Sequence, residues 1–491
     1  MKCTARFLAC LLPGCLLLAT GCTSNAVVGT EHDSLPGGEC GGVCPTPLFA
    51  DHIANGWSEV MDMAPTPDGD MVLVGRFAGT LEVPGGSVVD SGYSGNDMFL
   101  MKVSAGGDLV WVNRMKGNMP EVRVAVRPGG DIVLVGCFQG PAELNGFGPY
   151  VPIGSLDSFV QTIQPDGTAG APRVYDGEIY VNELVLAANG DALVAGELEM
   201  SANVDGVQLA PADMGGPGDW RPSDGVILRL SPSGDVVFAR TSGALGDDTL
   251  RSIVALPDGG MIVSGYHAAP FSFDGVSFPG EGAYLLALDA AGQTVWGSPI
   301  EPPAAPEGAS EESSSVLLGV ERTPDGRLLL LIRSWWGDDL GASVALRTLD
   351  GNGAQLGEVD LGIEVSNPVD PMGAVLGVDD FTVAENGDLL LGGPFSGTLD
   401  IGGAEVEGPL EYHRDGYLAR MSSTGELRWV QSFGAPVEGE GVLHVGHPRH
   451  VGFTSEGIPF IAGEYQGGLS IGEIELPYRD GPHAFMAAFA E

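Results

Sequence analysis

Short apolar runs separated by turn residues follow one another along most of this chain. Runs of this length with turn chemistry between them predict β-strands. In the clearest stretch the predicted strands cover residues 59–64, 71–77, 98–103 and 109–114. Thr66-Pro67-Asp68-Gly69-Asp70 separates the first two strands, and its Pro, Asp and Gly are the residues that a tight hairpin turn requires. The pattern therefore predicts a unit of four short antiparallel strands.

The predicted unit repeats. Its second strand ends in Gly75-Arg76-Phe77-Ala78-Gly79, and this element returns with spacings of 60 to 70 residues. The later copies are Gly136-Cys137-Phe138-Gln139-Gly140, Gly196-Glu197-Leu198, Gly265-Tyr266-His267, Gly393-Pro394-Phe395-Ser396-Gly397 and Gly463-Glu464-Tyr465-Gln466-Gly467, with a degraded copy at Ile332-Arg333-Ser334-Trp335-Trp336. A fixed period predicts a repeat architecture, so seven units form one large all-β domain over residues 46–491.

Further residues recur at fixed places in the unit, and both sets favour structural roles. Aromatic residues in the fourth strand predict packing between neighbouring sheets. They are Trp111, Phe238, Trp296 and Trp429. Carboxylates just before the third strand predict hydrogen bonds to turn amides. They are Asp97, Asp157, Asp224 and Asp415. An extra segment after the second strand, such as residues 80–83, predicts a small appended hairpin.

The two ends of the repeat array predict how it closes. The seventh unit ends after its third strand, at residues 483–490, and Pro47-Leu48-Phe49-Ala50 matches the fourth-strand sequence Leu427-Arg428-Trp429-Val430. We therefore expect the N-terminal strand to complete the last unit, which removes two exposed sheet edges.

This pattern resembles a seven-bladed β-propeller, and its style is similar to that of exported bacterial β-propeller repeat families. The resemblance covers about residues 46–491. Its motifs are Gly-x-aromatic-x-Gly, the Asp-x-aromatic of Asp97-Met98-Phe99 and Asp157-Ser158-Phe159, and Val-Trp on the fourth strand. These motifs are specific for the fold and imply no activity.

The N-terminus predicts export. Residues 1–21 combine Lys2 and Arg6 with an apolar stretch, as a signal peptide does. Thr20-Gly21-Cys22 resembles a bacterial lipoprotein processing site, although Ala19 stands where that family usually has Leu. We expect lipidation of Cys22 and, in the flexible tether of residues 22–45, a candidate disulfide between Cys40 and Cys44. Plain secretion is the alternative.

Charge narrows the classes of partner. The net charge is −43, from 65 acidic and 22 basic residues. Such a surface repels phosphate backbones, so no nucleic acid is expected. Solubility is the simpler interpretation of the charge, and weak accumulation of a divalent cation is the alternative; no other cofactor is expected. No later stretch predicts a membrane span, so the membrane is expected only through the lipid anchor.

No catalytic motif stands out, because Gly-x-Ser-x-Gly, His-Glu-x-x-His and a phosphate-binding Gly-Lys-Ser/Thr loop are all absent from the sequence. The long connections all fall between the second and third strands or between the fourth strand and the next unit, which places them on one face of a propeller. They cover residues 211–222, 336–341, 301–315, 363–376 and 436–448. We call this side the loop-rich face, and loops on a rigid scaffold are frequent binding sites.

Two features of the loop-rich face depart from the repeat. Tryptophans outside the repeated packing position are candidate contacts for sugar or peptide, with local packing as the alternative. The ligand-binding candidates are Trp335, Trp336, Trp220 and Arg221. His444, His447 and His450 are candidate metal ligands. Pro448 argues against a metal site, because it is expected to interrupt any regular strand that would position the three histidines.

The expected function is that of a monomeric, non-catalytic binding scaffold for a protein or glycan at the cell surface. The expected address is the cell envelope, lipid-anchored at the outer membrane or cell surface, with secretion as the alternative. Two other functions stay open. One is a hydrolase or lyase that acts on extracellular polymer at the propeller axis; the other is a passive structural envelope protein.

Overall fold

The computed structural model describes residues 45–53, 56–91, 96–212, 222–303, 313–336, 341–366, 377–408, 413–434 and 445–491. All of them belong to one compact unit, Pro36–Glu491. Apart from one short 3-10 helix, η1 (Pro84–Gly86), the elements of these residues are β-strands. The protein is therefore all-β, as the sequence predicts. No helix in the described ranges has the length and hydrophobicity to cross a membrane.

The strands form antiparallel sheets in which consecutive strands pair. An eleven-stranded sheet contains two runs of four, and five further sheets have four strands each in the described residues. The two runs are β2 (Ser58–Pro65), β3 (Met71–Phe77), β6 (Asp97–Val103), β7 (Leu109–Asn118), and β8 (Val122–Val126), β9 (Ile132–Leu144), β11 (Leu156–Ile163), β12 (Arg173–Asp176). They join where Lys116 of β7 pairs with Glu143 of β9.

The five four-stranded sheets follow in chain order. Three are β13 (Ile179–Leu186), β14 (Ala192–Leu198), β17 (Asp224–Leu230), β18 (Val236–Ser242); β19 (Thr249–Ala255), β20 (Met261–His267), β23 (Gly282–Leu288), β24 (Thr294–Ile300); and β25 (Ser313–Arg322), β26 (Leu328–Trp336), β27 (Gly341–Leu349), β28 (Gln355–Asp360). Two are β30 (Asp380–Val383), β31 (Leu389–Phe395), β34 (Asp415–Met421), β35 (Leu427–Phe433); and β36 (Val445–Phe453), β37 (Pro459–Ile471), β38 (Ile474–Ala490), β1 (Thr46–Ile53).

The predicted appended hairpins are confirmed. They are formed by β4 (Thr80–Val83) with β5 (Ser87–Asp90), β15 (Ala202–Val204) with β16 (Val207–Leu209), β21 (Phe271–Phe273) with β22 (Val276–Phe278), and β32 (Thr398–Ile401) with β33 (Ala404–Glu407); β10 (Phe147–Tyr150) pairs with the end of β9. The expectation of long connections was wrong in part. Residues 313–315 begin β25, and residues 445–448 begin β36. Within the connection 363–376, residues 363–366 form β29 (Ile363–Ser366), because the edge of β32 offers them unpaired backbone groups.

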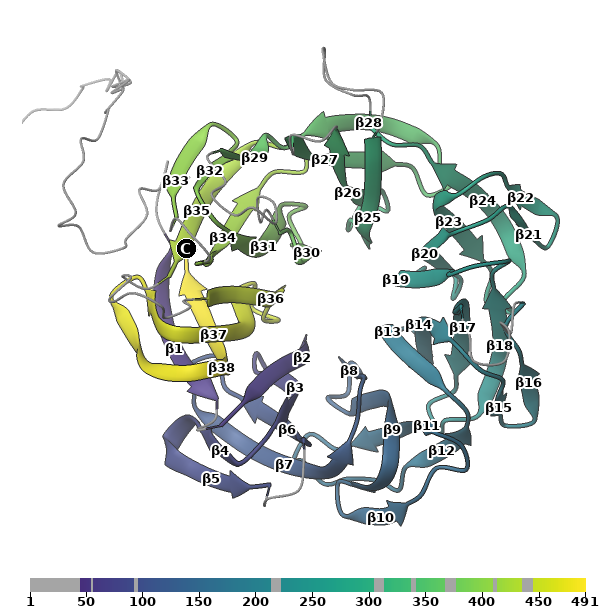
Figure 1. The fold of residues 1–491 in the computed structure, drawn as a ribbon, viewed down its shortest axis with the longest axis horizontal. Coiled ribbons are helices and arrows are strands. Elements are labelled where there is room, and N and C mark those ends of the chain that lie inside the picture. Colours follow the sequence, from purple (N-terminus) through teal and green to yellow (C-terminus); the bar gives the residue numbers. More distant parts are fainter. Residues whose placement is uncertain are drawn as a thin grey trace, which may run out of the picture. The chain divides into compact units, whose positions relative to one another are not determined.

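The first strands of the sheets lie innermost and contact one another in a closed cycle (Figure 1). In this cycle β2 contacts β8, β8 contacts β13, β13 contacts β19, β19 contacts β25, β25 contacts β30, β30 contacts β36, and β36 contacts β2. The hydrophobic core lies between successive sheets. One cluster, for example, unites Leu73 and Phe99 of one sheet with Phe460 and Met486 of the next, all at 0% exposure.

The repeated glycine is required by this geometry. A Cβ atom on Gly75 would lie 2.1 Å from the carbonyl oxygen of Glu59 in the paired inner strand. The same clash would occur at Gly196 with Tyr180 and at Gly463 with His447. No side chain fits at such distances, so the recurrence of glycine marks a close approach of two backbones beside a β-bulge.

The predicted pairing of the two ends is present. β1 pairs with β38 from Thr46↔Ala490 to Ile53↔Ala484 and forms the fourth strand of that sheet. Phe49 of β1 lies against Gly107, in the turn between β6 and β7, where an added Cβ would lie 2.7 Å from the ring. It also packs edge-on to Phe460, with ring centroids 5.9 Å apart.

The other fourth-strand aromatics confirm the predicted packing between sheets. Trp111 lies against Gly167 of the following sheet and donates its Nε1 hydrogen to the carbonyl of Pro165 at 3.0 Å. Phe238 lies likewise against Gly292, and Trp296 against Gly353. Each aromatic ring thus covers the turn of the next sheet, where only glycine leaves room for it.

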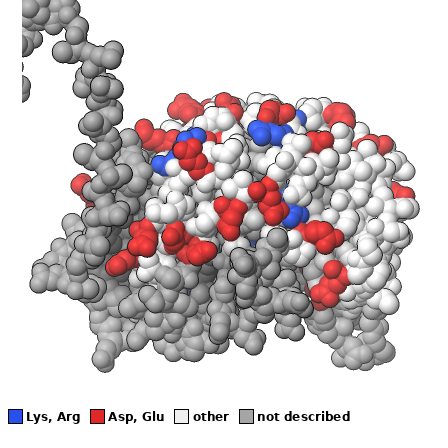
Figure 2. Space-filling model, turned by 90° about the horizontal axis from the view of Figure 1, so that it is seen from above, with Lys and Arg blue, Asp and Glu red and all other residues white. Residues whose placement is uncertain are grey.

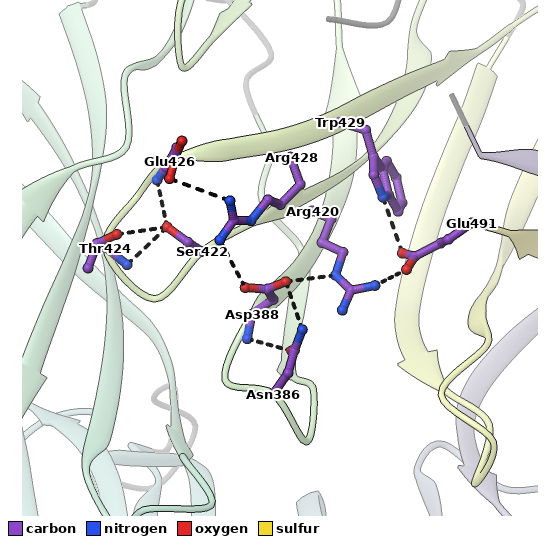
Figure 3. A network of polar contacts seen from close by, with 9 residues as sticks. All are labelled: Asn386, Asp388, Arg420, Ser422, Thr424, Glu426, Arg428, Trp429 and Glu491. Carbon is purple, nitrogen blue, oxygen red and sulfur yellow. Dashed lines mark hydrogen bonds and ion pairs between the residues drawn. The ribbon is translucent and has the colours of Figure 1, made fainter. Parts of the chain in front are cut away.

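Trp429 contacts the neighbouring sheet through a hydrogen bond to a carboxylate (Figure 3). Its Nε1 hydrogen goes to Oε1 of Glu491 at 3.1 Å, and the other carboxylate oxygen of Glu491 binds Arg420. Arg420 also donates to Asp388, in the turn between β30 and β31, at 3.2 Å. This network joins the sheet of β35 to the residue that follows β38.

The prediction that Pro448 interrupts a regular strand was wrong. β36 runs from Val445 to Phe453, and Pro448 pairs with Gly463 inside it. The register shifts between Pro448 and His450. A proline is tolerated at such a bulge, because the ladder there does not depend on its missing N–H group.

Candidate functional site

Polar side chains occupy one repeated position on the inner strands. In each ladder this position pairs with the residue just before the repeated glycine, as Asp62 pairs with Val74 and Asp380 with Gly392. Arg123, Glu183 and His450 hold the same position in β8, β13 and β36. Together with Glu321, two residues further along β25, they form what we call the axial cluster: Asp62, Arg123, Glu183, Glu321, Asp380 and His450.

The carboxylates of the axial cluster affect one another's pKa values. Burial raises the pKa of Glu183 to about 8, and the negative charges of Asp62 and Asp380 add to the rise. Burial likewise raises the pKa of Glu321 and of Asp380 to about 8, while Asp62 rises only to about 6 because Arg123 opposes the effect. Solvent still reaches part of these side chains, since Asp380 is 35% exposed.

Several of these side chains satisfy backbone groups of the neighbouring inner strand. The N–H of Val124 in β8 donates to Asp62 at 2.7 Å, and the N–H of Val451 in β36 donates to Asp380 at 2.9 Å. Arg123 donates from Nε to the carbonyl of Asn182 in β13 at 2.8 Å. Inner strands are edge strands whose free backbone groups need partners. At these three junctions the axial cluster supplies them and ties one inner strand to the next.

A second polar group, which we call the histidine clasp, consists of Asp379, His447, Arg449 and Glu464. Nε2 of His447 contacts Oδ2 of Asp379, and Nδ1 lies 3.5 Å from Oε1 of Glu464. Burial opposes protonation of His447, but its two carboxylate partners outweigh burial and raise its pKa. The hydrogen bond to His447 lowers the pKa of Glu464 to about 2. The clasp therefore favours the protonated form of His447 and joins two sheets.

The histidines predicted as metal ligands do not form one group. His447 belongs to the clasp, whereas His450 lies in the axial cluster, 4.0 Å from Asp380, and burial lowers its pKa to about 3. His444 lies outside the described residues. Among the described residues no group of three or more His, Cys, Asp or Glu side chains is placed to hold a metal ion.

The ligand-binding candidates have different outcomes. Trp335 and Trp336 lie at the end of β26, where their backbones pair with Ser314 and Ser313 of β25 and with β27. They extend a regular ladder. Trp220, Arg221, Cys22, Cys40 and Cys44 lie outside the described residues.

The predicted structural role of the third-strand carboxylates is confirmed at three positions. Asp97 accepts the N–H of Gly117 at 3.1 Å, Asp157 accepts that of Gly177 at 3.3 Å, and Asp224 accepts that of Ala212 at 2.7 Å. For Asp415, burial raises the pKa to about 7. Cys137 is fully buried, as expected of a small hydrophobic residue, and its pKa rises to about 12.

Sequence reasoning missed the axial cluster, although a signal was present. Each member at the repeated position stands thirteen residues before the repeated glycine, as Asp62 stands before Gly75 and Glu183 before Gly196. Reading that column across the units gives Asp, Arg, Glu, Ser, Gly, Asp and His, a polar series in otherwise apolar strands. On the face drawn in Figure 2, acidic side chains are spread among uncharged ones, and basic side chains are fewer.

Comparisons with known proteins leave the function open. No family model matches the chain, and no curated protein matches it. The similar solved structures include a protein of unknown function from Bacteroides caccae, with 12% identity, a TM-score of 0.33 and coverage of 62% of this chain and 83% of that one. Another is the Pyrococcus horikoshii acylaminoacyl peptidase, with 12% identity, a TM-score of 0.39 and coverage of 88% and 52%. Likeness at this level carries no argument about activity.

Proposed function

We propose that this chain is a seven-bladed β-propeller that acts as a non-catalytic binding scaffold for a protein or glycan partner through its loop-rich face. The closed cycle of inner-strand contacts supports the propeller, since each sheet then contributes one strand to the axis. The pairing of β1 with β38 supports closure by the N-terminal strand.

The hydrogen bonds and ion pairs that the polar side chains already make favour a binding function over a catalytic one. The carboxylates of Asp62 and Asp380 accept backbone N–H groups, and both nitrogens of His447 face carboxylates. A general base needs a free lone pair within reach of its substrate. His447 has none while it is clasped on both sides.

The observation that carries the proposal is the extension of the sheet of β26. This strand has nine residues, whereas its counterparts β3, β14, β20 and β31 have seven each; β9 and β37 have thirteen each because they continue into the appended segment. The two additional positions are those of Trp335 and Trp336, at the strand end that leads into the connection to β27. A strand that carries tryptophans in its sequence at this end is a favourable base for recognition.

The test compares two faces of the scaffold. A partner is first identified by cross-linking at the cell surface, and its affinity is then measured for purified variants. Trp335→Ala and Trp336→Ala should each weaken binding by roughly 1 to 3 kcal/mol if they are hot spots. Asp258→Asn, in a short turn at the other ends of the strands, should leave affinity unchanged. Loss of affinity in the turn variant alone would show that the binding site lies on the face of the short turns and would refute the proposal.

The axial cluster supports one second candidate, an enzyme that acts on extracellular polymer at the axis. Carboxyl groups with raised pKa values are typical of general acids. Purified protein would be incubated with acidic and neutral polysaccharides, and Glu183→Gln and Asp380→Asn would be compared with the native chain. Depolymerisation that both variants abolish would replace the binding proposal. A passive structural role is the remaining alternative, and no observed contact favours it.

The proposed address is the cell envelope, with a lipid on Cys22. The Cys22→Ser variant should lose fatty-acid labelling and leave the membrane fraction. Unchanged membrane association of this variant would mean that another group tethers the chain.

A further inference from the structure

Strand β28 is the most exposed of the fourth strands and lies at the outer rim of the ring of sheets (Figure 1). All of its residues are exposed, whereas each of the other fourth strands has half-buried or buried positions. Among the described residues β28 pairs with β27 alone, so the backbone groups along its outer edge have no strand partner there. An edge of this kind can accept a further strand from another molecule.

The sheet of β28 has no room for an appended hairpin, because only residues 337–340 separate β26 from β27. In the two preceding sheets the hairpin strands β16 and β22 contact the fourth strands β18 and β24. β29, which follows β28 in the chain, pairs with β32 and not with β28. In the described part of the chain the outer edge of β28 therefore stays uncovered.

Gly357 of β28 holds the position that an aromatic residue holds in other fourth strands. It pairs with Thr348 just before a register shift, as Trp111 pairs with Lys102. The ring of Trp111 covers the turn of the next sheet. At Gly357 no heavy atom of the described residues, apart from its chain neighbours, lies within 4 Å of the place that a Cβ atom would take. β28 therefore leaves open space at a position where other fourth strands carry a ring.

The apolar side chains beside Gly357 indicate what can fill this space. Leu356 is 59% exposed and Val359 is 37% exposed. Val359 lies against Gly425, in the turn of the next sheet. An aromatic residue that stands opposite a glycine on a neighbouring strand can fold its ring over that glycine. On an added strand such a ring would cover Gly357 and contact Val359, which lies on the same face of β28.

The charge of β28 favours a basic partner. The strand carries Glu358 and Asp360 and no basic residue. Arg347 donates to Glu358 at 2.6 Å, whereas Asp360 forms no ion pair among the described residues. Because side chains alternate between the two faces, basic residues that flank the aromatic one on an added strand would lie on the face of Asp360. The net charge of −43 attracts the same kind of segment.

We propose that the outer edge of β28 binds an extended segment of a partner protein, which adds to the sheet as a fifth strand. An aromatic residue of this segment lies over Gly357, and the Lys or Arg residues that flank it face Asp360. The backbone edge supplies affinity, and the open position at Gly357 supplies specificity. This surface is the rim of the ring and not the loop-rich face, so the inference goes beyond the proposed function and does not depend on it.

Fluorescence anisotropy of a labelled synthetic peptide, Lys-Thr-Lys-Trp-Lys-Val-Lys-Thr, tests the site on the full chain. The peptide should bind saturably, and the same peptide with Ala in place of Trp should bind at least about tenfold more weakly. Gly357→Trp fills the open space from within the chain and should also weaken binding at least about tenfold. Leu356→Lys should weaken binding severalfold, because it repels the basic peptide. Val295→Lys, at the equivalent exposed position of β24, is the matched control and should bind as the native chain does.

Four results would overturn the inference. One is the absence of saturable binding by the Trp peptide. A second is equal binding of the Trp and Ala peptides, which would leave only a general attraction to an acidic protein. A third is unchanged binding in both Gly357→Trp and Leu356→Lys; the latter changes an exposed side chain and is expected to leave folding intact. A fourth is a dimer in sedimentation that Gly357→Trp dissociates, which would assign the edge of β28 to a second copy of this chain.

Discussion

Replacing Glu183 with glutamine should remove a pH-dependent loss of stability. Glu183 lies half-buried in β13, and its pKa is raised from 4.5 to about 8, first by burial and then by the charges of Asp62 and Asp380. A carboxyl group with a raised pKa in the folded state holds its proton more tightly there than in the unfolded chain. The free energy of unfolding therefore decreases as the pH rises from 4.5 to 8.

The magnitude follows from the size of the pKa shift. A full shift from 4.5 to 8 corresponds to about 5 kcal/mol, at about 1.4 kcal/mol for each pH unit. This is an upper limit, because solvent reaches part of the side chain and the neighbouring carboxylates titrate together with it. We expect Glu183→Gln to gain about 2 kcal/mol over the native chain at pH 8, and to match it at pH 4.5, where the native side chain is protonated.

Urea unfolding followed by tryptophan fluorescence measures this difference at pH 4.5, 6 and 8. Glu426→Gln is the control, since the Glu426 side chain is 72% exposed. Its stability should follow that of the native chain at every pH. If the free energies of unfolding of Glu183→Gln and of the native chain differ by the same amount at every pH from 4.5 to 8, the carboxylates of the axial cluster do not interact as described.

Three further predictions concern the ring and its core. Deletion of residues 23–45 should leave the melting temperature nearly unchanged, whereas deletion of residues 23–53 removes β1 and should lower it markedly; equal melting temperatures would contradict closure by β1. Glu491→Gln should lower the free energy of unfolding by about 1 kcal/mol, because Arg420 and Trp429 lose a charged partner, and an unchanged urea midpoint would show that this contact is not stabilising. Cys137 should resist iodoacetamide at pH 8 until urea unfolds the chain, as mass spectrometry would detect, since burial raises its pKa to about 12; rapid labelling of the folded protein would mean that β9 opens.

The repeat was readable from the sequence because local chemistry generates it. Turn residues such as Asp68 and Gly69 act within four or five residues, and the register of β2 and β3 follows from them. The fourth-strand aromatics could be interpreted in the same way, because one packing contact recurs in successive units. Local rules failed at Pro448, where a bulge between Pro448 and His450 lets the strand continue. They also failed at residues 363–366, which form a strand only because β32 lies beside them.

The sequence by itself determined the all-β class, the four-strand unit, the appended hairpins and the pairing of the first strand with the last. Only the tertiary structure decided which side chains meet. Asp62, Glu183 and Asp380 are each more than one hundred residues from the next, yet they act on one another's pKa values at the axis. Ser264 resembles an ordinary strand residue in the sequence, and only the structure shows that its hydroxyl is buried with no hydrogen-bond partner among the described residues. Charge interaction and burial depend on distances that a chain acquires only when separate units are brought together, so no local pattern encodes them.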